Sequence, residues 1–168
     1  MDALVCGIDP ALGTSGYAVL RCAGEALTVV DAGACRSDEQ EPLALRLVAI
    51  ERDICSVFEE HRPDVVAIEE LYSHYKHPRT AILMGHARGV MLLAAARMGI
   101  EVRGYAATRI KRFLTGNGRA TKQQMQRAIQ KTLGLASVPE PPDVADALAI
   151  AMCCAADMRV PAGLGGVT

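Results

Sequence analysis

The stretch Ala3-Leu4-Val5-Cys6-Gly7-Ile8 is followed directly by Asp9-Pro10. A short apolar run bounded in this way predicts a buried β-strand, and the proline ends it because proline has no N–H to donate to a neighbouring strand. Asp9 therefore lies at the carboxyl end of an apolar strand, where an acid does not help burial. Gly13-Thr14-Ser15-Gly16 then predicts a turn.

Along the rest of the chain, the spacing of apolar residues alternates between that of β-strands and that of α-helices. Tyr17 to Arg21 and 26–32 are expected to be strands joined by a hairpin at 22–25, and a strand at 64–69 ends in Glu69. The remaining elements are expected to be a strand at 100–105 and helices at 42–61, 79–98, 107–114, 121–133 and 142–157, with Thr121 and Gln124 forming a capping box. Short early turns favour antiparallel pairing, and strand–helix–strand crossovers favour parallel pairing. The fold class is therefore α/β, a five-stranded mixed sheet flanked by helices.

Length and composition bound the possibilities further. The chain of 168 residues is 51% hydrophobic and 22% charged, which suits one domain over 1–158 with a loose Gly/Pro-containing tail at 159–168. No apolar run approaches the roughly 18 residues of a membrane span, and the start lacks a basic, signal-like segment. The six cysteines form no CxxC pair, so they are interpreted as small core residues of a cytoplasmic protein rather than as a disulfide frame or zinc site.

The net charge of −1 conceals a strong asymmetry. Between Tyr72 and Lys131 lie twelve of the 18 Lys and Arg residues, but Glu101 is the only acid there. A solvated face of mixed sign would need interspersed acids. The basic block instead predicts binding to a polyanion.

Four acids occupy positions that suit a metal site. Asp9 and Glu69 each end an apolar strand, and sites in open α/β sheets lie at the carboxyl ends of strands. Asp143 and Asp146 are three residues apart, so they share a face at the start of the last helix, although Asp143 could also be there for the helix dipole alone. Converging carboxylates need a cation, and Mg²⁺ or Mn²⁺ prefers oxygen ligands. One or two such ions beside a basic surface predict phosphodiester hydrolysis by water.

These residues carry a family resemblance. Four segments resemble the motifs of RuvC-type Holliday junction resolvases and occur in the same order. They are Gly7-Ile8-Asp9-Pro10 with the following Gly13–Gly16 turn, Ala67-Ile68-Glu69-Glu70, Gly85-His86-Ala87-Arg88-Gly89, and Asp143 to Ala151. That family belongs to the ribonuclease H-like superfamily. The resemblance covers residues 4 to 155, although Ala11 stands where the family commonly has glycine.

The resemblance implies catalytic and metal-binding roles for Asp9, Glu69, Asp143 and Asp146, with Mg²⁺ as cofactor and Mn²⁺ as a substitute. It implies phosphate contacts for Lys111 and Lys122, and a wedge at the junction for Tyr72. The residues themselves add further candidate DNA contacts, in the aromatic and cationic loop and on the basic rim: Tyr75, Lys76, Arg79, Arg109, Arg112 and Arg119.

The implied function is resolution of four-way DNA junctions by paired, symmetric nicks during recombination and repair. The implied partners are junction DNA, a second copy of the chain and the branch-migration complex (RuvA and RuvB type). Gly85 and Gly89, four residues apart on a helix, fit close approach of that second copy, but ordinary core packing would explain them equally. Three rivals remain: a ribonuclease H-like nuclease for RNA or RNA–DNA hybrid, an actin-like nucleotide-binding module, and a non-catalytic DNA scaffold.

Overall fold

The computed structural model describes residues 2–71 and 78–159, which form a five-stranded sheet in the order β3-β2-β1-β4-β5. β1 pairs antiparallel with β2 and β2 with β3, whereas β4 is parallel to β1 and β5 is parallel to β4. The predicted mixed sheet is confirmed. Its strands are β1 (Asp2–Asp9), β2 (Thr14–Ala23), β3 (Ala26–Arg36), β4 (Val65–Glu69) and β5 (Glu101–Tyr105).

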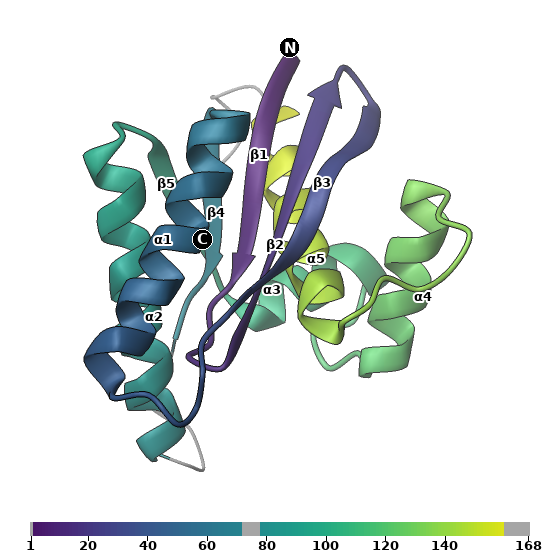
Figure 1. The fold of residues 1–168 in the computed structure, drawn as a ribbon. Helices are drawn as coiled ribbons and strands as arrows, with labels where there is room; N and C mark the ends of the chain where they lie inside the picture. Colours follow the sequence, from purple (N-terminus) through teal and green to yellow (C-terminus); the bar gives the residue numbers. More distant parts are fainter. Residues whose placement is uncertain (1, 72–77, 160–168) are drawn as a thin grey trace, which may run out of the picture.

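Helices cover both faces of the sheet (Figure 1). One apolar core lies between the sheet and α1 (Leu43–His61) with α2 (Pro78–Arg97). The other lies between the sheet and α5 (Pro142–Arg159), with contributions from α3 (Ala107–Thr115) and α4 (Lys122–Leu133). Among the described residues no helix is long and apolar enough to cross a membrane.

Alternate residues of β1 belong to the two different cores. Cys6 and Ile8 belong to the core beneath α1 and α2, whereas Val5 belongs to the core beneath α5. Side chains alternate between faces along a strand, so Gly7 and Asp9 also face α5. The sequence therefore directs the terminal acid of β1 towards the last helix.

The turn expected at Gly13–Gly16 is wrong for three of its four residues. Thr14, Ser15 and Gly16 belong to β2, where Gly16 pairs with Asp9, and the chain reverses over 10–13 instead. Ladder pairing with β3, and of Gly16 also with β1, overrides the local preference of these small residues for a turn. β3 is also longer than expected, whereas the helix boundaries agree within two residues.

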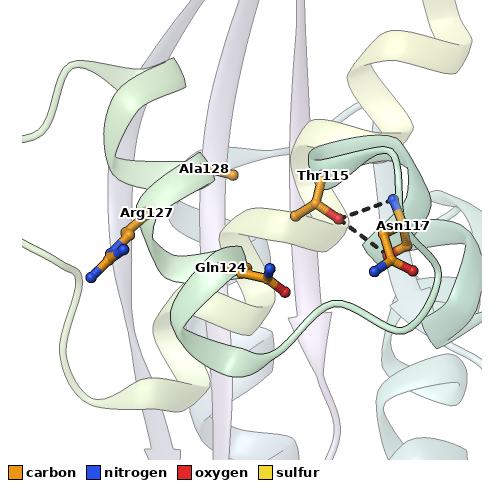
Figure 2. A pocket seen from close by; sticks show the side chains of 5 residues that line it. All are labelled: Thr115, Asn117, Gln124, Arg127 and Ala128. Atoms are coloured by element: carbon orange, nitrogen blue, oxygen red, sulfur yellow. Dashed lines mark hydrogen bonds between the residues drawn. The ribbon is translucent and has the colours of Figure 1, made fainter.

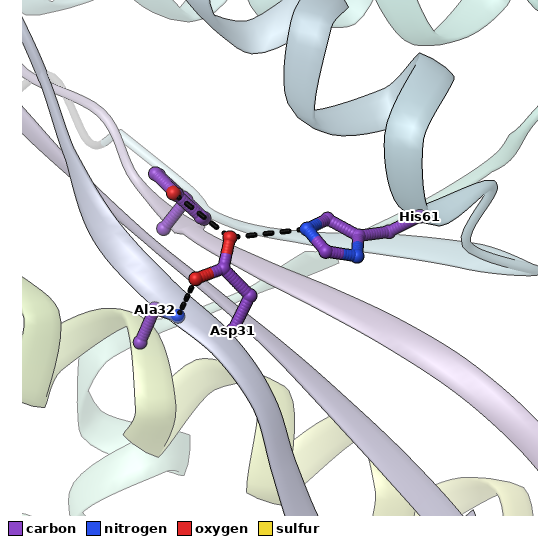
Figure 3. A network of polar contacts seen from close by, with 4 residues as sticks. Asp31, Ala32 and His61 are labelled. Carbon is purple, nitrogen blue, oxygen red and sulfur yellow. Dashed lines mark hydrogen bonds and ion pairs between the residues drawn. The ribbon is translucent and has the colours of Figure 1, made fainter.

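A polar network ties the end of α1 to the sheet (Figure 3). Asp31 Oδ2 accepts a hydrogen bond from the Tyr17 hydroxyl and lies 3.0 Å from His61 Nε2. Asp31 Oδ1 accepts from the N–H of Ala32. Burial and the bond to Asp31 raise the pKa of Tyr17, so the phenol remains a neutral donor. The network fixes α1 on β2 and β3 and contains none of the four candidate acids.

Candidate active site

Asp9 and Glu69 end two neighbouring parallel strands. Ile8 pairs with Ile68 in the β1–β4 ladder, so the two acids follow at the next register position. Ala67, two residues before Glu69, faces the α5 core, and Glu69 shares its side of the sheet. The structure thus places both acids, half-buried, on the α5 side of the same sheet edge.

Two glycines let α5 approach the sheet closely enough to add the other two acids. A Cβ on Gly7 would lie 2.2 Å from the carbonyl oxygen of Ala147, and a Cβ on Gly16 would lie 1.9 Å from that of Asp143. Gly16 is also the cross-strand partner of Asp9. The first turns of α5 therefore lie directly against the end of β1, and Asp143 and Asp146 arrive beside Asp9.

A serine that the sequence analysis did not single out holds the turn after Asp9. Among the described residues, Ser15 is the one buried polar or charged side chain. Its hydroxyl accepts a hydrogen bond from the N–H of Ala11 and donates to the carbonyl of the same residue. The Ser37 N–H donates to the carbonyl of Gly13 from the other side. Ser15 lies inside a predicted turn, so only its burial reveals the role.

The acids influence one another's protonation. Burial, followed by the charges of Asp146, Glu69 and Asp143, raises the pKa of Asp9 from 3.8 to about 7. Burial and Asp146 raise the pKa of Glu69. Burial and Asp143 likewise raise the pKa of Asp146. Three of the four carboxyls thus resist ionisation, as expected for a buried group of like charges.

Two lysines oppose this effect. The charge of Lys111 lowers the pKa of Glu69 and Asp146, and the charge of Lys122 lowers that of Asp9 and Asp146. Lys111 also lines a small cavity together with Glu69 and Asp146. The two lysines predicted to contact DNA phosphates therefore flank the carboxylates.

The donor set suits a hard divalent cation. Four carboxylates offer oxygen ligands, and a bound cation would relieve the repulsion that raises their pKa values. Among the described residues, however, no three His, Cys, Asp or Glu side chains lie close enough together to form a ready metal-binding group. The four acids share one region, and binding one ion through three of them requires their side chains to draw closer.

The other predicted DNA contacts are distributed unevenly. Arg79, Arg112 and Arg119 are exposed. Arg109 donates to both oxygens of Asp157 at 2.6 and 2.7 Å, and its guanidinium lies 5.3 Å from the centroid of the Tyr105 ring. These contacts tie α3 to α5, the Arg109 side chain remains 58% exposed, and its predicted contact with DNA stays a prediction. Three further predicted contacts lie outside the described residues: Tyr72, Tyr75 and Lys76.

A second cavity lies between α3 and α4 (Figure 2). It has a volume of about 300 Å³ and is lined by Thr115, Asn117, Gln124, Arg127 and Ala128. Thr115 Oγ1 accepts from the N–H of Asn117, and Gln124 completes the confirmed capping box with Thr121. Its one charged lining residue, Arg127, is cationic.

The outer face of α2 is apolar and open. Gly85, His86 and Gly89 are exposed, and a Cβ on either glycine would meet nothing within 4 Å. Ile82 and Leu93 continue this face and are 61% and 48% exposed. Core packing within the chain therefore does not explain the two glycines.

The strand order, the parallel and antiparallel pairing and the acids at the ends of β1 and β4 define a protein of the ribonuclease H-like fold. The family profile described as "Crossover junction endodeoxyribonuclease RuvC" matches residues 5–154. The chain belongs to this family of endodeoxyribonucleases, which are hydrolases.

Individual relatives agree over nearly the whole chain. The chain is 52% identical to RuvC of Rhodopirellula baltica over 89% of its own length and 84% of the relative's. It is 41% identical to RuvC of Heliobacterium modesticaldum, over 90% and 93% of the two chains. T. thermophilus RuvC, solved in complex with a Holliday junction substrate, superimposes with a TM-score of 0.87 at 32% identity, covering 94% of this chain and 95% of that one.

Proposed function

We propose that this protein resolves four-way (Holliday) DNA junctions by paired, metal-dependent hydrolysis of phosphodiester bonds, as part of DNA recombination and repair. The observation that carries the proposal is the convergence of four acids and two lysines at one sheet edge of a RuvC-type fold. The acids suit a cation, and the lysines suit the phosphates on either side of the bond to be cleaved. The relative bound to a Holliday junction supports the choice of substrate.

In the proposed mechanism Asp9, Glu69, Asp143 and Asp146 hold one or two Mg²⁺ ions, with Mn²⁺ as a substitute. When bound, the metal lowers the pKa of water and neutralises charge on the phosphate. Partial burial beneath α5 lowers the effective dielectric around the acids and so strengthens their electrostatic interaction with the cation. Lys111 and Lys122 orient the phosphate backbone. We extend this role to Arg79, Arg109, Arg112 and Arg119, of which Arg109 also pairs with Asp157.

We further propose that the open face of α2 meets a second copy of the chain. Two glycines one helical turn apart, flanked by exposed Ile82 and Leu93, allow two helices to pack closely. A two-fold dimer would present two active sites to a two-fold junction, which explains paired nicks. We also propose that residues 1–158 form a single domain. The partner proteins proposed for it are a branch-migration complex of the RuvA and RuvB type.

The test compares labelled four-way junction, linear duplex and RNA–DNA hybrid, each with and without Mg²⁺. Paired nicks in the junction, dependent on metal, are expected. Asp9→Asn should retain junction binding and lose cleavage, while Glu25→Gln, an exposed acid in the hairpin, should behave as wild type. Cleavage of the hybrid with an intact junction would overturn the proposal in favour of a ribonuclease activity. Cleavage by Asp9→Asn near the wild-type rate would overturn the role of Asp9.

A further inference from the structure

The peptide group that joins Glu69 to Glu70 is held at both of its polar atoms. The N–H of Glu70 donates to the carbonyl of Tyr105 at 2.9 Å, which continues the β4–β5 ladder. On the other side, the carbonyl of Glu69 accepts from Nε of Arg88 at 2.9 Å. This second bond comes from a helix rather than from a strand.

The reason lies in Pro10. The backbone N–H of Glu70 bonds towards β5. Backbone N–H and C=O groups of successive strand residues point to opposite sides, so the backbone groups of Glu69 point towards β1. In the parallel β1–β4 register, where Ile8 pairs with Ile68, the ladder donor for the Glu69 carbonyl would be the N–H of residue 10. Residue 10 is proline and has no N–H. Arg88 supplies the hydrogen bond that the sheet cannot.

Arg88 suits this task for two reasons. It projects from α2, a 20-residue helix packed against α1, so its backbone is fixed relative to the sheet. In the part of the chain that the structure describes, it forms no ion pair with a carboxylate. A guanidinium that donates to a carbonyl forms a charge-assisted bond, which is stronger than a neutral one.

We propose that Arg88 is a positioning residue, which holds the end of β4 so that the Glu69 carboxylate is oriented for cation binding. The inference rests on the proposed function. The carbonyl and the carboxylate belong to the same residue, so losing the bond frees the peptide from which the side chain departs. Partners that orient metal ligands affect metal affinity or activity about 10- to 100-fold when removed.

The test uses Arg88→Met, which keeps the apolar stem but has no donor, and Arg88→Lys, which keeps a charged donor. Arg97→Met, on the same helix with only an exposed ion pair to Glu51, is the matched control. Calorimetric titration of each protein with Mn²⁺, without DNA, measures cation affinity directly. We expect Arg88→Met to bind Mn²⁺ about tenfold or more weakly, Arg88→Lys to recover much of the loss, and Arg97→Met to match wild type.

Junction cleavage gives a second readout. Arg88→Met should cleave slowly at low Mg²⁺ and recover as Mg²⁺ rises, with unchanged junction affinity. Wild-type Mn²⁺ affinity in Arg88→Met, or equal losses in Arg88→Met and Arg88→Lys, would overturn the proposal. If Arg88→Met does not fold, Arg88→Gln, whose shorter side chain cannot reach the carbonyl, replaces it. A wild-type protein that binds Mn²⁺ but leaves junctions intact would overturn the proposed function alone, because the titration still decides the role of Arg88.

Discussion

Gly16 shows how a single missing side chain can build a site. Its Cα lies against the backbone of Asp143, where a Cβ would approach the carbonyl oxygen to 1.9 Å. Because a helix backbone cannot yield as a flexible side chain can, any larger residue must push the start of α5 away from the sheet. The acids of α5 would then move away from Asp9.

We therefore expect Gly16→Ala to lower the free energy of unfolding by about 1–3 kcal/mol, as overpacking usually does. Junction cleavage should fall by about tenfold or more, because small misplacements of reacting groups are costly. Thermal denaturation and single-turnover cleavage measure the two effects. Gly13→Ala is the control, because its Cβ would lie 3.6 Å from the nearest atom, a side-chain oxygen of Glu39. Equal effects of the two changes would contradict the argument.

The protonation of Asp9 predicts a pH dependence. Its pKa of about 7 in the folded protein lies above the usual 3.8, so the native state holds the proton more tightly than the unfolded chain. Without metal, stability from this group is present at low pH and is lost as pH rises through about 7, at a cost of up to about 4 kcal/mol. Cation binding needs the ionised form and should weaken below that pH.

The measurement is chemical denaturation without metal at about pH 5.5 and about pH 8, together with Mn²⁺ titration at both values. Wild type should be more stable, but bind Mn²⁺ more weakly, at the lower pH. Asp9→Asn should flatten the pH dependence of stability, and Glu25→Gln should leave it unchanged. A wild-type protein whose stability rises with pH across this range would show that other groups dominate.

At the scale of elements, α2 has two different faces. Ala87 and Met91 are buried in the core against the sheet, while Gly85 and Gly89 on the outer face lie next to empty space. Glycine in a helix interior costs stability, so two on one open face call for a packing reason. A second helix in close approach supplies that reason.

Gly89→Glu should break the proposed dimer, because it places a bulky charge where two copies of α2 meet. The isolated chain should become no less stable, since glutamate is the better helix former and its Cβ meets nothing. Analytical ultracentrifugation measures the oligomeric state and thermal denaturation measures stability. Ala23→Glu, at an exposed position at the end of β2, is the control. If the Gly89→Glu protein remains dimeric, the dimer interface does not lie on this face of α2.

At the scale of the whole molecule, the charges are segregated. The cations of α3 and α4 lie on the α5 side of the sheet, where Lys111 and Lys122 approach the acids, whereas Arg79, Arg88 and Arg97 lie on α2 at the other face. A nearly neutral protein can thus bind a polyanion through one surface. The acids and cations form one site because the chain folds them onto the same edge.

Replacing both Lys111 and Lys122 by alanine should weaken junction binding and flatten its dependence on salt. Each phosphate contact contributes about 0.9 to the slope of log affinity against log salt concentration, so the double variant should lose about two. Fluorescence anisotropy at several salt concentrations measures this slope. Arg52→Ala, an exposed cation on α1 paired with Asp53, should keep the wild-type slope. An unchanged slope in the double variant would show that neither lysine faces phosphate.

The sequence by itself determined the order of helices and strands and the acidic residues at the carboxyl ends of β1 and β4. Apolar runs ending in Asp9 and Glu69 predicted two strands that end in acids, and the period of the later segments predicted the helices within two residues. These features depend on local patterns of burial, which a sequence displays directly. The positions of Asp143 and Asp146 at the start of the last helix completed the set of four acids, and the family motifs implied their catalytic and metal-binding roles.

Only the tertiary structure decided which partners these residues meet. Arg109 pairs with Asp157, 48 residues away, and no local pattern in the sequence indicates that ion pair. Ser15 holds the turn, and Arg88 replaces the donor that Pro10 lacks. Contacts of this kind depend on the register and distance between elements distant in the chain. No local period encodes them, so packing of α5 across Gly7 and Gly16 and of α2 against the sheet end determines the geometry of the site.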